Sequence, residues 1–126
     1  MTETGAVRVM LVEDHADFRR LVAAVVDREA DLEVVAQAGS LGEARARIAS
    51  EGCDVAVLDM GLPDGVGSDL IAVLREACPG SAVLILSASL DAANLARVKE
   101  AGANEVLDKF VHPTKVVGAI RRLGAG

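Results

Sequence analysis

The sequence predicts an α/β protein in which five parallel strands form one sheet with helices on both faces. Five short apolar segments alternate with five segments whose apolar residues recur every three or four positions, the pattern of strands followed by helices. Two of the short segments, residues 55–58 and 82–86, are apolar throughout, as is typical of strands buried on both faces of a parallel sheet. The length of 126 residues suits one domain with one core.

The five predicted strands end at turns or at polar residues. The third, residues 55–58, reads Val-Ala-Val-Leu and is followed directly by Asp59. Residues 60–65 contain two glycines and a proline, which is turn chemistry that cannot continue a strand. Asp59 is therefore expected at the carboxyl edge of the sheet, where open α/β folds bind ligands. The strands are predicted at residues 7–12, 33–38, 55–58, 82–86 and 104–107.

The helices are predicted from apolar spacing and from residues that start or stop a helix. Ser40 is placed to cap the second helix, Gly102 to end the fourth and Pro113 to begin the fifth. Residues 79–80, Pro-Gly, break the third. Residues 124–126 are expected to be a frayed tail or the start of a linker. The helices are predicted at residues 17–28, 41–50, 68–77, 91–101 and 113–123.

Composition and charge narrow the class of partner. The net charge of −6 argues against a nucleic-acid surface and more weakly against binding to anionic membranes. Phe18 and Phe110 are the only aromatic residues, so there is no stacking platform for single-stranded nucleic acid. Cys53 and Cys78 have no metal-site spacing and are expected to be small buried hydrophobes in a reducing compartment. With no signal peptide and no membrane-spanning run, the protein is expected in the cytoplasm.

Polar side chains follow four of the five predicted strands. Glu13 and Asp14 follow the first, Asp59 the third, Ser87 the fourth and Lys109 the fifth. Because the carboxyl ends of parallel strands lie on one edge of the sheet, these groups are expected to converge. Three close carboxylates raise at least one pKa unless a cation joins them, and an all-oxygen ligand set suits Mg²⁺. Together with the lysine and the hydroxyl, they form a set suited to phosphoryl transfer onto Asp59.

Each of these residues taken alone has a plainer interpretation. Asp14 fits equally well as the N-cap of the first helix, and Asp59 as the residue that opens a loop. Ser87 alone would be a loop hydroxyl, and Lys109 alone a solvated lysine. His15 is expected to be a helix-start residue rather than a ligand. It is the occurrence of five such groups at four of the strand ends that predicts a site.

This set of residues resembles the receiver domain of bacterial two-component response regulators, the CheY-like superfamily. The resemblance is carried by Glu13-Asp14, by Asp59 within Leu-Asp-Met-Gly-Leu-Pro, by Ser87-Ala88 after an apolar strand, and by Lys109. It implies a flavodoxin-like (βα)5 fold, with a doubly wound parallel sheet in the strand order 2-1-3-4-5. The implied function is a signalling switch that catalyses only its own phosphorylation and dephosphorylation.

The resemblance also implies the phosphoacceptor and the metal site. Asp59 would accept a phosphoryl group from a phosphohistidine on a sensor histidine kinase or a phosphotransfer protein, or from a small phosphodonor. Mg²⁺ would be held by Asp14, Asp59 and the backbone carbonyl of Gly61. Glu13 would act mainly through bound water.

The implied switch involves the remaining two site residues. Ser87 would hydrogen-bond the phosphoryl group and draw its loop inward, while Lys109 would pair with the same group. The contacts of the face formed by the fourth helix, fifth strand and fifth helix would change. Val106 stands where the family usually has an aromatic ring that swings inward, which puts the usual coupling in question. Phe110 stands where many receivers have proline after the lysine. Because a cis bond there would cost roughly 3–4 kcal/mol, a trans bond is predicted.

The resemblance extends to the organisation of the whole protein. Residues 1–126 are expected to be a single receiver domain, with its core at about 7–123 and no output domain. Segments 14–15, 31–35 and 62–63 most resemble receivers attached to LuxR-type helix-turn-helix domains. A DNA-binding output domain beyond this chain is one expectation, and action alone by docking to a partner is another. A homodimer is also open.

Three other functions fit parts of the pattern. A phosphatase or mutase of the haloacid dehalogenase type also uses a strand-end Asp, but needs a second Asp where Gly61 stands. A flavodoxin-like cofactor binder would need Trp or Tyr for stacking and a phosphate loop, and residues 65–67 do not make a dinucleotide fingerprint. A degenerate receiver that signals by binding alone is supported only by Val106.

Overall fold

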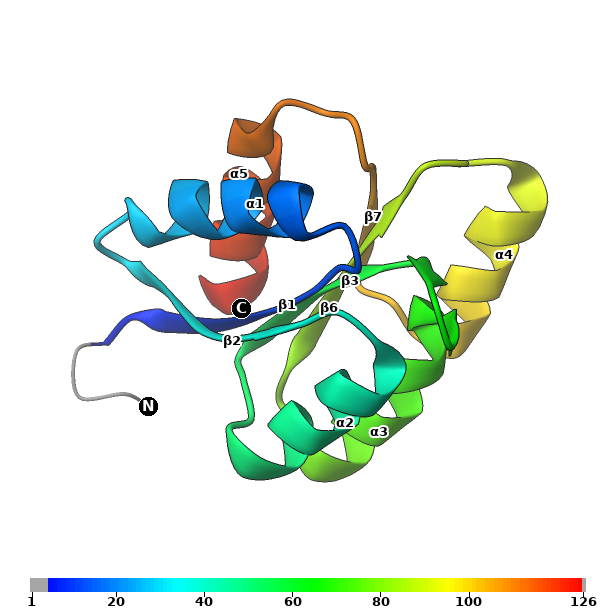
Figure 1. The fold of residues 1–126 in the computed structure, drawn as a ribbon, viewed down its shortest axis with the longest axis horizontal. Helices are drawn as coiled ribbons and strands as arrows, with labels where there is room; N and C mark the ends of the chain where they lie inside the picture. The colour runs from blue at the N-terminus through cyan, green and yellow to red at the C-terminus, as the bar shows by residue number, and fades with distance from the viewer. Residues whose placement is uncertain (1–4, 126) are drawn as a thin grey trace.

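The structure is a computed structural model that describes residues 5–125, and its centre is a five-stranded parallel sheet (Figure 1). The strand order is β2-β1-β3-β6-β7, and every neighbouring pair runs parallel. Counted along the chain within this sheet, the order is 2-1-3-4-5, which confirms the doubly wound flavodoxin-like fold. The strands are β1 (Val7–Val12), β2 (Leu32–Ala38), β3 (Val55–Asp59), β6 (Ala82–Ser87) and β7 (Glu105–Asp108).

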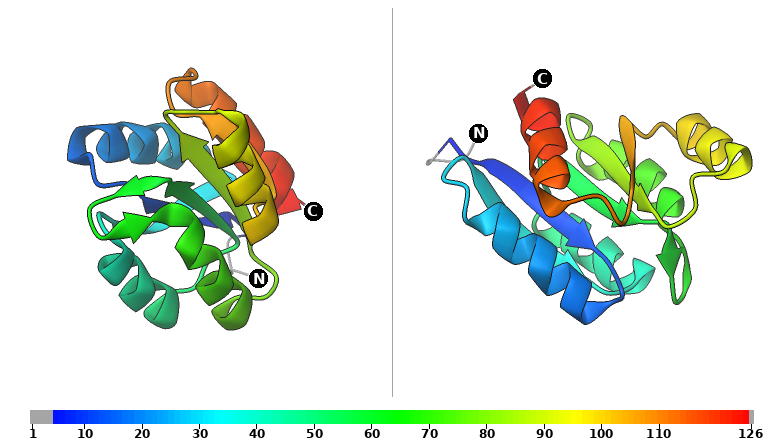
Figure 2. Two further views of the ribbon diagram at one scale, coloured as in Figure 1. Left: turned by 90° about the vertical axis from the view of Figure 1, so that its right-hand side faces the viewer. Right: turned by 90° about the horizontal axis from the view of Figure 1, so that it is seen from above.

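Helices cover both faces of the sheet, as two views at right angles show (Figure 2). On one face lie α1 (Ala16–Asp27) and α5 (Pro113–Ala125), which contact each other. The other face is covered by α2, α3 and α4, whose buried residues belong to a single apolar cluster. Their bounds are Leu41–Ser50, Leu70–Ala77 and Ala92–Ala101.

The apolar strands divide their side chains between two cores. Successive residues of a strand point to opposite faces, so neighbours such as Val57 and Leu58 belong to different clusters. All five residues of β3 are buried, as are all six of β6. This burial on both faces explains why these two segments are apolar along their whole length, apart from the polar residue that ends each one.

The helix starts follow capping chemistry. Ser40 caps α2 by accepting a hydrogen bond from the amide of Glu43, and Asp91 caps α4 in the same way. At α1 the cap is His15, whose Nδ1 accepts from the amide of Phe18, so the alternative role of Asp14 as the cap does not hold. Gly102 ends α4 with φ of 100°, a left-handed conformation that favours glycine.

The segment after Asp59 is more ordered than a turn. Residues 61–66 form a small antiparallel hairpin, β4 (Gly61–Leu62) and β5 (Gly65–Val66). A 3-10 turn, η1 (Gly67–Asp69), follows it, so α3 begins at Leu70 rather than at Ser68. The prediction of a helix from residue 68 was therefore two residues too early.

The hairpin is tied to α2 by the side chain of Asp64. Its Oδ1 accepts a hydrogen bond from the amide of Leu41 at 2.8 Å, and its Oδ2 accepts from the amide of Gly42 at 3.1 Å. These amides belong to the first turn of α2, where backbone donors have no partner inside the helix. Asp64 therefore acts as a second cap for α2, whose first residues precede it by more than 20 positions.

Asp64→Asn is expected to lower the free energy of unfolding at neutral pH. The hydrogen bonds from Leu41 and Gly42 lower the pKa of Asp64 below its ordinary value of 3.8. A folded-state pKa below the unfolded one gives stabilisation that is complete above the unfolded pKa and lost as the pH falls through the folded pKa. Urea unfolding from neutral to about pH 3 should therefore show the difference between the two proteins shrinking with acid. A difference that stays constant would contradict this role.

Several smaller expectations concern the cysteines, one peptide bond and the end of the chain. Cys53 is buried, which raises the pKa of its thiol to about 12, whereas Cys78 is only partly buried. The peptide bond between Lys109 and Phe110 is trans, as predicted. The prediction of a tail at residues 124–126 was wrong for Gly124 and Ala125, which continue α5; Gly126 lies outside the described residues. Within the described part of the chain, no helix has the length and apolarity needed to cross a membrane.

Candidate functional site

The predicted site residues lie at one edge of the sheet, at the carboxyl ends of its strands. Asp59 is the last residue of β3 and Ser87 the last of β6, while Glu13 directly follows β1 and Lys109 directly follows β7. Carboxylate oxygens of Glu13, Asp14 and Asp59 lie within 4.8 Å of one another. Parallel pairing accounts for this convergence, because every strand of the sheet ends at the same edge.

Lys109 joins two of the carboxylates. Its Nζ lies 2.9 Å from Oε1 of Glu13 and 3.2 Å from Oδ2 of Asp59, and both carboxylate side chains are only 6% exposed. Burial by itself would lower the pKa of Lys109, but the pairing with Glu13 and the charge of Asp59 outweigh it and raise that pKa. The ring of Phe18 lies beneath the ammonium group, 5.2 Å from Nζ to the ring centroid. Lys109 is therefore a charged and well-positioned cation beside Asp59.

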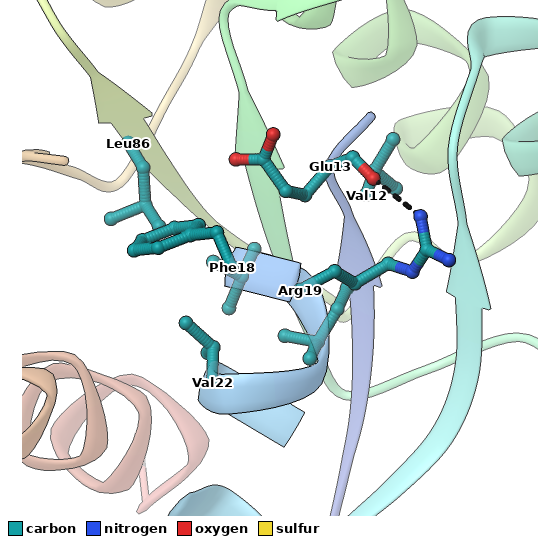
Figure 3. Close-up of a pocket in the computed structure, with 8 residues that line it drawn as sticks. Val12, Glu13, Phe18, Arg19, Val22 and Leu86 are labelled. Carbon is teal, nitrogen blue, oxygen red and sulfur yellow. Dashed lines mark hydrogen bonds between the residues drawn. The ribbon is translucent and has the colours of Figure 1, made fainter. Parts of the chain in front are cut away.

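Glu13 is held in place through both its backbone and its side chain. In Figure 3 its carboxylate points away from Arg19, whose guanidinium donates instead to the Glu13 carbonyl at 2.8 Å. The amide of His15 donates to Oε2 at 2.9 Å. Burial raises the pKa of Glu13 and outweighs the opposing effects of Lys109 and of the His15 amide. The other oxygen, Oε1, is buried and lies against Nζ of Lys109.

These carboxylates fit a divalent metal ion. Lys109 brings one positive charge to three close carboxylates, so negative charge remains that a cation can neutralise. Asp14 is exposed and adds a third carboxylate from the solvent side. Three oxygen donors within 4.8 Å, with open space beside them, suit a hard cation that keeps part of its water shell.

Ser87 lies in the same cleft but is bonded to its own loop. Its Oγ donates to the carbonyl of Ser89 at 2.8 Å and accepts from the amide of Ser89 at 3.2 Å. Gly61 also lines this cleft, and its amide donates to Oδ1 of Asp59 at 3.3 Å. The cleft has a volume of about 340 Å³.

Three residues of the site were not found from the sequence. Asn94 and Arg97, both on α4, line the same cleft as Asp59. Gly67 packs on the backbone of Asp59, and its amide donates to the carbonyl of Met60 at 3.0 Å. No signal in a single sequence indicates these roles, since each depends on the path of the backbone after the strand ends.

The two positions that depart from the family pattern have different environments. Val106 is partly buried and packs against the apolar cluster under α2, α3 and α4. Phe110 is 76% exposed, although it is one of only two aromatic residues in the chain. Together with Phe18 and Lys109 it borders a shallow hollow beside the cleft.

A five-stranded parallel sheet that ends in a lysine-paired aspartate and an acidic cluster defines the receiver class of signalling domains. The chain belongs to the response regulator receiver domain family, whose model matches residues 9–121. This settles the family to which the sequence resemblance pointed.

Known relatives place the chain near receivers of LuxR-type regulators. It is 36% identical over 120 residues to the DNA-binding transcriptional activator DevR/DosR of Mycobacterium tuberculosis, covering 95% of this chain and 55% of the relative. The chain thus spans about half the length of that protein. Among solved structures, the receiver domain of the putative response regulator NarL from M. tuberculosis is 29% identical with a TM-score of 0.89, covering 96% of this chain and 98% of that one. A LuxR-family response regulator from Aurantimonas sp. is 30% identical with a TM-score of 0.87, and the match covers 96% of this chain and 86% of that one.

Proposed function

We propose that this chain is the receiver of a two-component system and that Asp59 is its phosphoacceptor. The donor is a phosphohistidine on a sensor histidine kinase or a phosphotransfer protein, or a small phosphodonor. The observation that carries the proposal is the setting of Asp59, whose buried carboxylate ends the central strand 3.2 Å from Lys109. The cleft in front of it leaves room for a phosphoryl group and its donor.

The chemistry is a single displacement at phosphorus. A carboxylate oxygen of Asp59 forms the new P–O bond while the P–N bond to the donor histidine breaks, and the electron pair leaves on the imidazole nitrogen. Lys109 balances the charge on the phosphoryl oxygens. Ser87 donates a hydrogen bond to a phosphoryl oxygen after releasing the carbonyl of Ser89. Hydrolysis of the acyl phosphate restores Asp59, so the domain acts only on itself.

We propose Mg²⁺ as the cofactor of this site. Asp14, Asp59 and the backbone carbonyl of Gly61 would hold the ion, and Glu13 would act mainly through a bound water. The place of Glu13 in the acidic cluster supports this, since carboxylate oxygens of Glu13, Asp14 and Asp59 lie within 4.8 Å of one another. The bound ion supplies charge neutralisation for the carboxylates and for the phosphoryl oxygens.

Mg²⁺ is expected to raise the melting temperature of the wild-type protein. Binding to the folded state alone adds about 2.7 kcal/mol at a hundredfold excess over Kd, which for a domain of this size is a rise of roughly 10 °C. Asp14→Asn should lose most of that rise because it removes a proposed ligand. Asp17→Asn, which changes a carboxylate side chain that is 86% exposed, is the matched control and should keep it. Scanning calorimetry measures the melting temperatures. An equal rise in both variants would show that Asp14 is not a ligand of the ion.

The wider function rests on the same site. Phosphorylation would shift the population between two arrangements of the β6–α4 loop and change the contacts of the face formed by α4, β7 and α5. Those contacts could be with a target, with a second copy, or with an output domain. The LuxR-type relatives support a DNA-binding output domain beyond this single receiver domain. The net charge of −6 argues against direct nucleic-acid binding by the receiver itself. We propose that the receiver acts in the cytoplasm with its kinase.

The proposal is tested by incubating the protein with acetyl phosphate. With Mg²⁺ present, intact mass spectrometry should show one phosphoryl adduct that is labile to acid, and peptide mapping should locate it at Asp59. Chelation of the metal by EDTA should prevent the adduct. An adduct that forms equally well in EDTA, or that maps to another residue, would overturn the proposed function.

A further inference from the structure

The β6–α4 loop contains a carbonyl that accepts two side-chain hydrogen bonds. The carbonyl oxygen of Ser89 accepts from Oγ of Ser87 at 2.8 Å and from Nδ2 of Asn94 at 3.0 Å. Ser87 is one of the residues of the proposed phosphorylation site, and Asn94 is in the first turn of α4. One peptide group therefore connects the site directly to a helix on the proposed signalling face.

Further hydrogen bonds join this loop to the start of α4. Asp91 accepts from the amide of Asn94 at 2.8 Å, and its other oxygen accepts from Oγ of Ser89 at 3.2 Å. We call Ser87, Ser89, Asp91 and Asn94 the loop lock. Asn94 is the member whose side chain reaches back from the helix to the Ser89 carbonyl, and it also lines the cleft. The lock therefore holds the loop and the helix end as one unit.

Phosphorylation has to break one bond of this lock. A serine hydroxyl has a single proton, so Ser87 donates either to the carbonyl of Ser89 or to a phosphoryl oxygen, and not to both. The bond from Asn94 stabilises the loop conformation in which Ser89 is the acceptor. A contact made in only one of two conformations shifts the population toward that conformation.

Resting on the function proposed above, we propose that Asn94 is a positioning residue that holds the Ser89 carbonyl in place as the acceptor for Ser87 and thereby opposes activation. This role needs no aromatic ring at position 106, where the chain has valine. The movement of the loop would act on α4 through Asn94 itself. The lock thus gives the domain a route from the phosphoryl group to the helix that uses hydrogen bonds alone.

Binding of beryllofluoride with Mg²⁺, measured by isothermal titration calorimetry, tests this role. Asn94→Ala is expected to bind the phosphoryl mimic about fivefold more tightly than wild type, since one hydrogen bond opposing the bound conformation is worth about that factor. Lys99→Ala, an exposed change on the same helix, is the control and should bind as wild type does. Wild-type affinity or weaker binding in Asn94→Ala would overturn the role.

A double-mutant cycle separates positioning of Ser87 from a general effect on the helix. In a Ser87→Ala background there is no hydroxyl to position, so Asn94→Ala should no longer change the affinity. The same fivefold gain with and without Ser87 would overturn the proposal, because Asn94 would then act by another route. If the wild-type protein itself does not bind beryllofluoride, the proposed phosphoacceptor function fails, and the role of Asn94 fails with it.

Discussion

Asp59→Asn is expected to abolish the phosphoryl adduct formed with Mg²⁺ and acetyl phosphate. The amide of asparagine has nearly the shape of the carboxylate but is not a nucleophile toward phosphorus, so the cleft is retained and the reaction is lost. Intact mass spectrometry of wild type and variant, treated side by side, measures the effect directly.

The matched control for this experiment is Asp54→Asn. Asp54 directly precedes β3 and Asp59 ends it, so the two aspartates flank the same strand at opposite edges of the sheet. Oδ2 of Asp54 accepts a hydrogen bond from the amide of Arg8 at 2.9 Å, which an asparagine oxygen can also accept. The control should be labelled like wild type. Equal labelling of the Asp59 variant would show that another residue is the acceptor.

Gly67→Ala is expected to slow phosphorylation by roughly a hundredfold without removing any reacting group. A Cβ at this position would overlap the carbonyl oxygen of Asp59 and lie 2.9 Å from its carbonyl carbon. Backbone cannot give way as a flexible side chain can, so the peptide of Asp59 has to move. A displacement of about 1 Å in the nucleophile is enough for a loss of this size. Overpacking should also lower the free energy of unfolding by about 1–3 kcal/mol.

Gly80→Ala is the control for the effect of a methyl group as such. Gly80 lies in the turn after α3, and a Cβ there would have no heavy atom within 4 Å. Its rate of phosphorylation and its urea unfolding should match those of wild type. The rates for all three proteins can be followed by mass spectrometry over time. A wild-type rate in Gly67→Ala would mean that the loop adjusts without moving Asp59.

The layers of the fold could be predicted from the sequence because they depend on local patterns. The five strands of the parallel sheet and the five α-helices were predicted within two residues of their observed ends, since apolar runs, capping residues and glycine stops are visible in the sequence. The strand-end groups could be placed together for a related reason. Once the strands are parallel, Glu13, Asp59 and Lys109 need no further information to meet at one edge.

What escaped prediction depends on contacts between distant segments. Asp64 reads as an ordinary turn residue, and its bonds to Leu41 and Gly42 span more than 20 positions. Gly67 looks in the sequence like an ordinary loop glycine. In the structure its backbone lies so close to that of Asp59 that a larger residue does not fit. Asn94 reads as a polar residue near a helix start. Its bond to Ser89 appears only when the loop has a definite path.

The exposure of Phe110 has a practical consequence for spectroscopy. The protein has no tryptophan and no tyrosine, so it has no intrinsic fluorescence at wavelengths beyond the weak emission of phenylalanine. Phe110 adjoins Lys109 and is open to solvent, so an indole can be placed there without disturbing the core. Phe110→Trp would give the protein a single tryptophan beside the cleft, and ligand binding could be followed as a change in the fluorescence of that residue.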